Sequence, residues 1–228
     1  MTRFGDRISE AEQKLRDRLF GPLVLFIFPK WFTPNHVTAL RAFLVLTAII
    51  FFLVGISLGW QIFILIVAAL TDFVDGILAR ARKQYSLHGA YFDHAVDWFL
   101  GGWAGILALI NGLLPFSFMA AIITLQLGIT VIDRVRAANI EKNSSREKVL
   151  AIAMGAANFQ PSAFSRFQFF SILTGFFLIL LGHLWHSGVI RYFGLFFLYA
   201  AVVFAAILLF DTIYRLIVEK KLTNRAAN

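Results

Sequence analysis

The sequence predicts an all-α membrane protein with six transmembrane helices. Hydrophobic residues make up 59% of the 228 residues and charged residues only 15%, and the mean hydropathy is +0.76. A soluble globular domain contains about 45–50% apolar and about 25% charged residues. Six segments are apolar over roughly the 20 residues that a helix needs to cross a bilayer, at about 36–57, 59–80, 89–111, 114–134, 166–187 and 190–212.

A shorter apolar segment precedes these spans. Residues 8–31 begin as a charged amphipathic stretch, in which Ser9 and Glu12 have the spacing of a capping box, and become apolar toward the end. Only about ten apolar residues follow, which is too few to cross a bilayer. We therefore expect an interfacial helix along the inner leaflet, which either anchors the chain or shapes a lipid entry. Pro34-Asn35 then starts the first span, with Asn35 as the helix cap.

Lysine and arginine residues are concentrated on one side of the predicted spans. They lie in the N-terminal arm, in the connections after the second and fourth spans and in the C-terminal segment, whereas the other side has only Arg191. By the positive-inside rule, both termini are cytoplasmic. The formal net charge of +8 is then a feature of a surface that faces anionic lipid and not a nucleic-acid footprint.

No internal repeat and no second domain is visible in the sequence. We therefore expect residues 1–228 to form one membrane domain, with the interfacial helix at 8–31 and a six-helix bundle at 36–212. The chain contains no cysteine, which excludes disulfides and thiolate metal sites.

Four aspartates lie inside the second and third predicted spans. With its spacing, the pattern is Asp72-x2-Asp75-Gly76-x2-Ala79-Arg80-x8-Gly89-x3-Asp93-x3-Asp97. An ionisable group at membrane depth costs at least about 2.5–3.5 kcal/mol and rarely lacks a partner or a function. Each half of the pattern has the spacing of one helical face. The short connection at 81–88 predicts that the two spans are antiparallel neighbours.

The four carboxylates are expected to converge near the cytoplasmic surface. A rise of 1.5 Å per residue places Asp72 and Asp97 about 12 Å below that surface, and Asp75 and Asp93 about 6–8 Å below it. Acids so close together need positive charge. Hard divalent cations such as Mg²⁺ take carboxylate and phosphate oxygens as ligands, and two such ions can clamp a phosphoryl centre.

The residues between the acids and Arg80 fit a phosphate-bearing ligand. Gly76 and Ala79 have little or no side chain, so a nucleobase or pyrophosphate could approach the backbone there. Arg80 is placed for a charge-assisted bond to phosphate.

This pattern resembles, without a single departure, the signature of the CDP-alcohol phosphatidyltransferase family. A second motif agrees, since Pro34-Asn35-His36-Val37-Thr38-x2-Arg41 resembles the P-N-x2-T-x2-R that opens the first span in family members. Length, span number and the N-terminal helix also fit, so the resemblance extends over nearly the whole chain.

The resemblance implies an enzyme of phospholipid biosynthesis. It would transfer a phosphatidyl group from a CDP-lipid, CDP-diacylglycerol, to a small alcohol and release CMP. The resemblance also implies two Mg²⁺ (or Mn²⁺) ions held by Asp72, Asp75, Asp93 and Asp97, with Asp97 also acting as general base. The residues implied to bind the CDP-lipid are Asn35, Thr38, Gly76, Ala79, Arg80, Ser86 and Gly89. Family members commonly form homodimers, and we expect the same here, in the cell (inner) membrane with the active site facing the cytoplasm.

The acceptor alcohol is less closely defined. An acceptor with its own phosphate needs further cations, for which the candidates are Arg134, Arg136 and Arg166, although anchoring at the membrane surface is the alternative role of each. Residues 161–168 loosely resemble the G-K-x-K-T-x2-Q stretch of phosphatidylglycerophosphate synthases, with Ser165-Arg166 in place of Gly-Lys and no second lysine. Glycerol 3-phosphate is therefore the first expectation. Inositol phosphate, serine, choline, or phosphatidylglycerol in a cardiolipin-type reaction are the alternatives.

A cation-coupled membrane transporter is the alternative from a different class, because transporters also use intramembrane acids. Such a protein would favour broken helices and an internal repeat, and neither is visible. Arg41 lies inside the first span, where it is expected to pair with a site carboxylate, reach phosphate or extend to the membrane surface.

Overall fold

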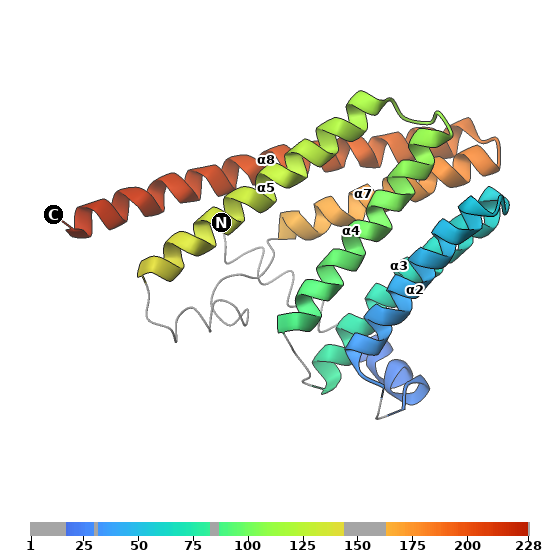
Figure 1. Cartoon of the computed structure of the whole chain (residues 1–228), viewed down its shortest axis with the longest axis horizontal. Helices are drawn as coiled ribbons and strands as arrows, with labels where there is room; N and C mark the ends of the chain where they lie inside the picture. The colour runs from blue at the N-terminus through green and yellow to red at the C-terminus, as the bar shows by residue number, and fades with distance from the viewer. Residues whose placement is uncertain (1–16, 30–31, 83–86, 144–162, 228) are drawn as a thin grey trace. The chain divides into compact units, whose positions relative to one another are not determined.

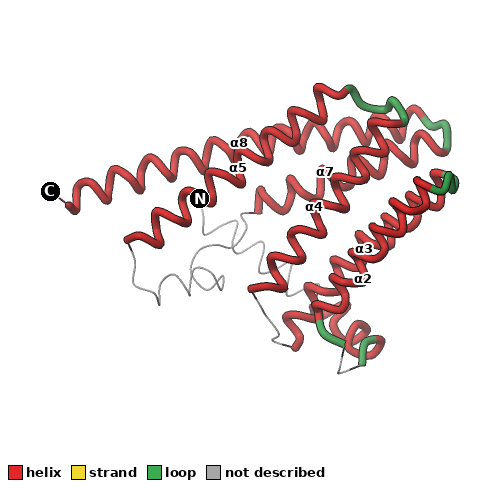
Figure 2. Tube along the Cα trace, in the orientation of Figure 1, coloured by secondary structure: helices red, strands yellow, loops and turns green. Residues whose placement is uncertain are grey.

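The computed structural model describes residues 17–29, 32–82, 87–143 and 163–227 (Figure 1). These residues form helices joined by short loops, with no strand among them, which confirms the all-α prediction (Figure 2). A helix at 17–27 is followed by α2 (Pro34–Leu53), α3 (Leu58–Arg82), α4 (Leu87–Ile110), α5 (Phe116–Asn143), α7 (Ala163–Leu184) and α8 (Gly188–Ala227).

Four helices in the described part of the chain are long and apolar enough to cross a membrane. They are Pro34–Leu53, Leu58–Arg82, Phe167–Leu184 and Gly188–Tyr214, and α5 contains a shorter apolar segment, Phe116–Ile132. Together they indicate an integral membrane protein. Helix α4 occupies the predicted third span and α5 the fourth, but the count of six spans and the orientation of the termini stay predictions.

Glycine-based caps end α2 and α4. Gly55 has a φ of 78° and donates its N–H to Phe52 O, while Ile56 N donates to Phe51 O, which is the hydrogen-bond pattern of a Schellman motif. Gly112, with a φ of 67°, ends α4 in the same way. Because of the cap at Gly55, α2 ends at Leu53, and the predicted end of the first span at 57 is wrong by one helical turn.

Two other predicted boundaries also need correction. The N-cap of α2 is Thr33 and not Asn35, and the Thr33 N–H donates to His36 Nδ1 at 3.0 Å. Helices α5 and α8 continue to Asn143 and Ala227, well beyond the apolar segments that predicted them. No glycine or proline interrupts either extension, so helix propensity carries each helix past the end of its hydrophobic stretch.

The chain separates into two compact units. The first comprises residues 1–113 and 173–195, and the second comprises residues 114–172 and 196–228. In the first unit α2 packs most extensively against α3 and less against α4, whereas α3 and α4 contact each other least. Helix α2 is therefore the element that the two acid-bearing helices share. In the second unit Gln168 Nε2 of α7 donates to Gln126 Oε1 of α5 at 2.7 Å, a polar contact typical of membrane helix packing.

The helix at 17–27 packs on the first unit. Val24 lies in a hydrophobic cluster with Val37, Ile77 and Leu78, and Phe28 and Phe32 pack against it. The other side of this helix exposes large apolar side chains, namely Leu19, Phe20, Leu23, Leu25, Phe26 and Ile27. An exposed apolar face next to a packed one favours the predicted interfacial position. Residues 8–16 and 30–31 of the predicted interfacial helix lie outside the described residues.

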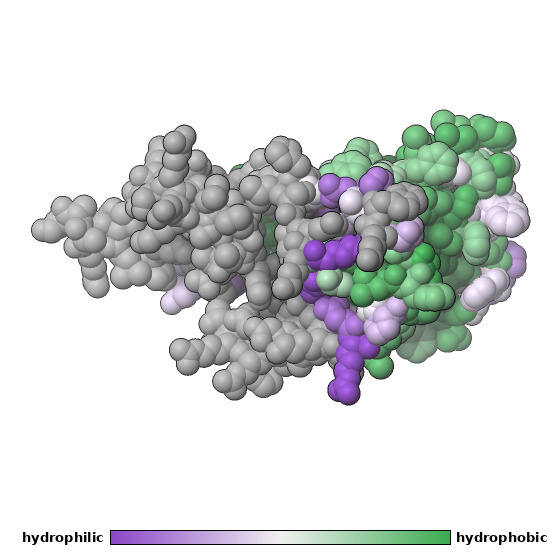
Figure 3. Space-filling view, turned by 90° about the horizontal axis from the view of Figure 1, so that it is seen from below, coloured by the Kyte–Doolittle hydropathy of each residue, from purple (hydrophilic) through white to green (hydrophobic). Residues whose placement is uncertain are grey.

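Large apolar side chains also cover the outer faces of the spans. Phe43, Phe99 and Phe210 are 64%, 68% and 74% exposed. Figure 3 shows a broad hydrophobic area on one face of the molecule, with hydrophilic residues gathered together beside it. Exposed apolar area on this scale is unfavourable in water but is solvated by lipid chains.

We predict that a methyl group at Gly194 destabilises the packing of α8 on α7. A Cβ at this position would lie 2.6 Å from Ile179 Cγ1 and 2.8 Å from Ile179 N, so the two backbones must move apart. Gly194→Ala should lower the free energy of unfolding by about 1–3 kcal/mol, measured by thermal unfolding in detergent. Gly102→Ala on α4 is the control, because no atom lies within 4 Å of its Cβ position. Equal melting temperatures for the two variants would contradict this packing.

Candidate active site

The guanidinium of Arg41 lies among all four aspartates of the motif. Nη2 contacts Asp72 at 3.0 Å and also Asp75, both on α3. Nη1 contacts Asp93 at 3.1 Å and also Asp97, both on α4. One arginine therefore links the acid pairs of two helices, and the expectation that Arg41 pairs with a site carboxylate is confirmed.

Arg41 interrupts a buried apolar stripe on α2. The other buried residues of this face are Val37, Thr38, Val45 and Ala48, at helical spacing around Arg41. The Arg41 side chain is 0% exposed, so it cannot extend to water. A buried charge in a membrane helix is tolerated when it is paired, and the four carboxylates supply that pairing. The Arg41 Nε atom is nevertheless buried and has no hydrogen-bond partner in the described part of the protein.

Three of the aspartates are arranged as a metal site would need them. Asp72, Asp75 and Asp93 each offer a carboxylate oxygen, and these oxygens lie within 4.8 Å of one another. Asp93 Oδ1 is buried and lies 3.1 Å from Arg41 Nη1. Oxygen donors at this separation suit a hard divalent cation. The predicted site therefore fits a metal ion at these three residues, and the role of Asp97 as a fourth ligand stays a prediction.

The carboxylates differ in their access to solvent. The side chains of Asp72 and Asp93 are 44% and 36% exposed, whereas those of Asp75 and Asp97 are 10% and 17% exposed. Asp72 and Asp93 therefore form the open side of the cluster. Asp75 and Asp97 form the closed side.

Gly76 and Arg80 lie together on α3. A Cβ at Gly76 would lie 3.4 Å from Arg80 Nη1, which shows that the guanidinium folds back over the glycine. The guanidinium of Arg80 therefore covers Gly76 of the same helix. The sequence predicted that a flat ligand could approach the backbone at Gly76. In the structure the Arg80 guanidinium lies next to this position.

The remaining residues that were predicted to bind the CDP-lipid differ in their exposure to solvent. Thr38 is buried one turn before Arg41, and its hydroxyl donates to Pro34 O at 3.3 Å. Asn35 is exposed at the start of α2, and Ala79 and Gly89 are partly exposed. Ser86 lies outside the described residues. The side chains of Arg134, Arg136 and Arg166 are also outside them, although their backbones belong to α5 and α7.

Sequence reasoning missed the partners of two arginines at the end of α3. Arg80 Nε and Nη2 bind Asp17 at 2.8–3.0 Å, and Arg82 Nη2 donates to the main-chain oxygens of Phe28 and Pro29 at 2.8 and 3.0 Å. Asp17 is 63 positions from Arg80 and lies in a segment rich in charges, so no local signal marks it.

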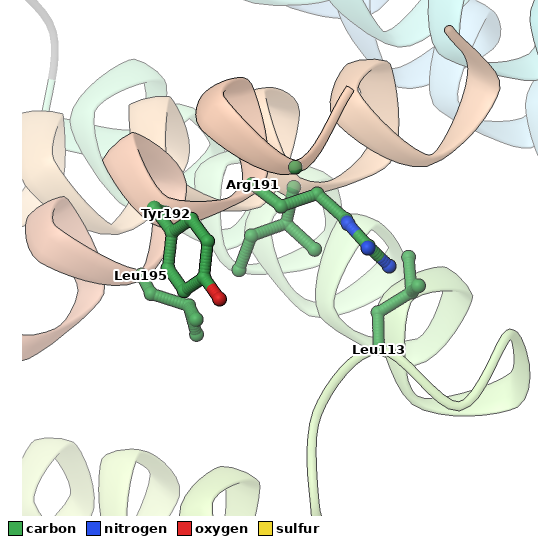
Figure 4. Close-up of a pocket in the computed structure, with 6 residues that line it drawn as sticks. Leu113, Arg191, Tyr192 and Leu195 are labelled. Carbon is green, nitrogen blue, oxygen red and sulfur yellow. The ribbon is translucent and has the colours of Figure 1, made fainter. Parts of the chain in front are cut away.

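A small cavity in the first unit is separate from the carboxylates. It has a volume of about 120 Å³ and lies at the turn between α7 and α8 (Figure 4), where its lining is Leu113, Ile179, Gly188, Arg191, Tyr192 and Leu195. A Cβ at Gly182 would lie 2.6 Å from Arg191 Cγ, so the aliphatic part of the arginine side chain packs tightly on α7. Helix packing therefore explains the position of the Arg191 side chain.

Fold and site together define a polytopic membrane protein with a carboxylate cluster suited to divalent cations between its helices. The chain matches the model of the CDP-alcohol phosphatidyltransferase family over residues 31–207 and belongs to this family. Similar curated proteins from Mycobacterium bovis and Mycobacterium tuberculosis H37Rv, each named "Putative cardiolipin synthase", are 30% identical over 91 residues. The matched region covers 40% of this chain and 44% of the length of each relative.

We predict that Arg41→Met destabilises the protein most when metal is removed. The substitution leaves four carboxylates without their shared counter-charge, and breaking a buried ion pair typically costs about 3–5 kcal/mol. Thermal unfolding in EDTA should show this loss, and Mg²⁺ should restore part of it by supplying positive charge. Arg18→Met, at an exposed position of the helix at 17–27, is the control. An unchanged melting temperature of Arg41→Met in EDTA would contradict the role given to Arg41.

We also predict that the three clustered aspartates bind divalent metal. Asp72→Asn, Asp75→Asn and Asp93→Asn should each weaken Mn²⁺ binding by at least about tenfold, since even changes outside the ligand shell cost that much. Electron paramagnetic resonance of free Mn²⁺ measures this directly. Asp211→Asn on α8 is a matched control outside the cluster, and equal losses in all four variants would count against the site.

Proposed function

We propose that this protein transfers a phosphatidyl group from a CDP-lipid to an alcohol and releases CMP. The observation that carries the proposal is the convergence of Asp72, Asp75, Asp93 and Asp97 on Arg41 in a member of the CDP-alcohol phosphatidyltransferase family. A helix–helix ion pair needs one acid and one base, whereas this site holds four acids around one base. The excess negative charge favours a site for cations.

The charges of the site fit two divalent ions and an anionic donor. Four carboxylates and one guanidinium leave three net negative charges, which would repel a pyrophosphate. Two divalent cations would turn this into one net positive charge. When bound, such ions neutralise the pyrophosphate and stabilise the charge that develops on the departing CMP. Asp72, Asp75 and Asp93 would hold them, with Asp97 as a further ligand.

Asp97 is the residue that we propose as general base. It accepts the proton of the acceptor hydroxyl, whose oxygen then attacks the phosphorus that carries the lipid. The bond from this phosphorus to the bridging oxygen breaks, and CMP leaves with that oxygen and its electron pair. Arg41 Nη1 contacts Asp97, so it would orient the carboxylate during the proton transfer.

The donor is proposed to lie along the cytoplasmic part of α3. Arg80, whose guanidinium lies over Gly76, would supply hydrogen-bond donors to phosphate at this point of the motif, and Ala79 and Gly89 would allow a close approach to the backbone. Asn35, Thr38 and Ser86 are proposed to complete the CDP site, on the resemblance of their motif to that of the family. Because the site opens at Asp72 and Asp93, the lipid chains could remain in the bilayer during the reaction.

For the acceptor we propose a molecule with a terminal glycerol hydroxyl. Glycerol 3-phosphate is the acceptor that the sequence favours, and Arg134, Arg136 and Arg166 are the proposed ligands of its phosphate. The name of the mycobacterial relatives favours phosphatidylglycerol as a second candidate. Inositol phosphate, serine and choline remain alternatives for the same chemistry. We further propose a homodimer in the cell (inner) membrane, with cytoplasmic termini and the site facing the cytoplasm.

The test is CMP release by purified protein from CDP-diacylglycerol and Mg²⁺, with one acceptor in each reaction. We expect release with glycerol 3-phosphate or with phosphatidylglycerol, and a loss of about 10²–10⁴-fold in Asp97→Asn, which removes the general base. Asp211→Asn should keep the activity of the native chain. Release with inositol phosphate, serine or choline would overturn the acceptor alone. No release with any acceptor, from protein that is folded and binds Mn²⁺, would refute the transferase proposal and favour cation transport.

A further inference from the structure

The contact between Arg80 and Asp17 uses only one edge of the guanidinium. Arg80 Nε donates to Asp17 Oδ1 at 3.0 Å and to Oδ2 at 2.8 Å, and Nη2 donates to Oδ1 at 2.8 Å. Nη1 takes no part in this contact. Because a guanidinium is planar, binding along one edge fixes the direction in which the remaining nitrogen points.

The remaining nitrogen of Arg80 lies next to Gly76. A Cβ at Gly76 would be 3.4 Å from Nη1 and 3.8 Å from Nη2, so Nη1 is the nitrogen nearest to this part of α3. Gly76 directly follows Asp75, whose carboxylate belongs to the three-aspartate cluster. The Asp17 contact therefore leaves Nη1 as the guanidinium nitrogen nearest to Gly76, the residue that follows Asp75 in the motif.

Asp17 is itself held in place, because the segment that directly follows its helix is bound to α3. Arg82 Nη2 donates to Phe28 O and Pro29 O at 2.8 and 3.0 Å, and Arg82 Nη1 donates to Phe32 O. Phe28 and Pro29 directly follow the helix at 17–27, and Pro29 O also accepts the N–H of Phe32 at 2.9 Å. Between the two arginine contacts, Val24 packs with Ile77 and Leu78 of α3.

We propose that Asp17 is a positioning residue for the donor nucleotide, because it holds the Nε–Nη2 edge of Arg80 and presents Nη1 to a phosphate oxygen of the CDP moiety. This inference rests on the proposed function, since it takes Arg80 to bind the CDP phosphates. The Arg80 and Asp17 side chains are 23% and 34% exposed, and ion pairs this open contribute little to folding stability. Loss of the Asp17 carboxylate should therefore change the orientation of Arg80 and the affinity for CDP, with little change in folding stability.

Removal of the Asp17 charge distinguishes two roles of this residue by whether CDP binding becomes weaker or stronger. Weaker binding indicates that Asp17 positions Arg80, and stronger binding indicates that Asp17 competes with a phosphate for Arg80. Removing the Asp17 charge makes the surroundings of Arg80 more positive, and by Coulomb attraction alone this would strengthen binding of an anionic donor. Strengthened binding would also follow if Asp17 occupied the place of a phosphate and had to be displaced. Positioning predicts the opposite, because Arg80 without Asp17 samples other orientations.

The experiment measures CDP binding by calorimetry in Mg²⁺ and the kinetics of CMP release, both with the full chain in detergent. Asp17→Asn should weaken CDP binding and raise KM for CDP-diacylglycerol by about five- to twentyfold, with kcat and the acceptor KM within about twofold of the native values. Asp17→Glu keeps the carboxylate and should restore CDP affinity to within about threefold. Arg18→Gln, one position along the same helix, is the control and should change neither quantity.

A double variant tests whether Asp17 acts through Arg80. Asp17→Asn combined with Arg80→Gln should bind CDP no more weakly than Arg80→Gln alone, because residues that act through one contact are not additive. Additive losses, tighter CDP binding by Asp17→Asn, or failure of that variant to fold would each overturn the inference and leave the proposed function standing. If the native chain neither binds CDP nor releases CMP, both proposals fall.

Discussion

The buried guanidinium of Arg41 is the interaction on which the arrangement of the first unit depends. Helices α3 and α4 contact each other less than either contacts α2, and the faces that they turn toward Arg41 carry four acids. Without a shared cation those faces would repel each other in a medium of low dielectric constant. Arg41 converts this repulsion into attraction, since each of its terminal nitrogens binds the acid pair of one helix.

This arrangement requires Arg41 and the acids to lie at the same depth, and the turn between α2 and α3 sets that depth. With a rise of 1.5 Å per residue, Arg41 lies about 18 Å from the end of α2 at Leu53, and Asp72 lies about 21 Å from the start of α3 at Leu58. The Schellman cap at Gly55 allows the chain to reverse within four residues. A hairpin closed this tightly brings the two positions level, within the reach of an arginine side chain.

Much of this organisation could be predicted from the sequence, because it depends on local patterns. The apolar windows predicted where helices form, and the spacing of the acids predicted that Asp72, Asp75 and Asp93 come together. Helix ends were predicted less well, since hydropathy reports burial in lipid and not where the backbone leaves the helix. Thr33 caps α2 although Asn35 was the predicted cap, because Pro34 is accommodated at the first helical position, which fixes the cap one residue earlier.

The contacts of Arg80 and Arg82 could not be predicted, for a different reason. The positive-inside rule counts every cation at the membrane surface alike, and the motif predicted for Arg80 only a contact with phosphate. In the structure Arg80 binds the Asp17 carboxylate of the helix at 17–27, and Arg82 binds the carbonyls of Phe28 and Pro29, which directly follow this helix. Pairing of this kind depends on how a separate helix docks, and neither composition nor periodicity contains that information. A helix for which the sequence predicts either membrane anchoring or a role in lipid entry is thereby connected to a motif residue of the candidate site.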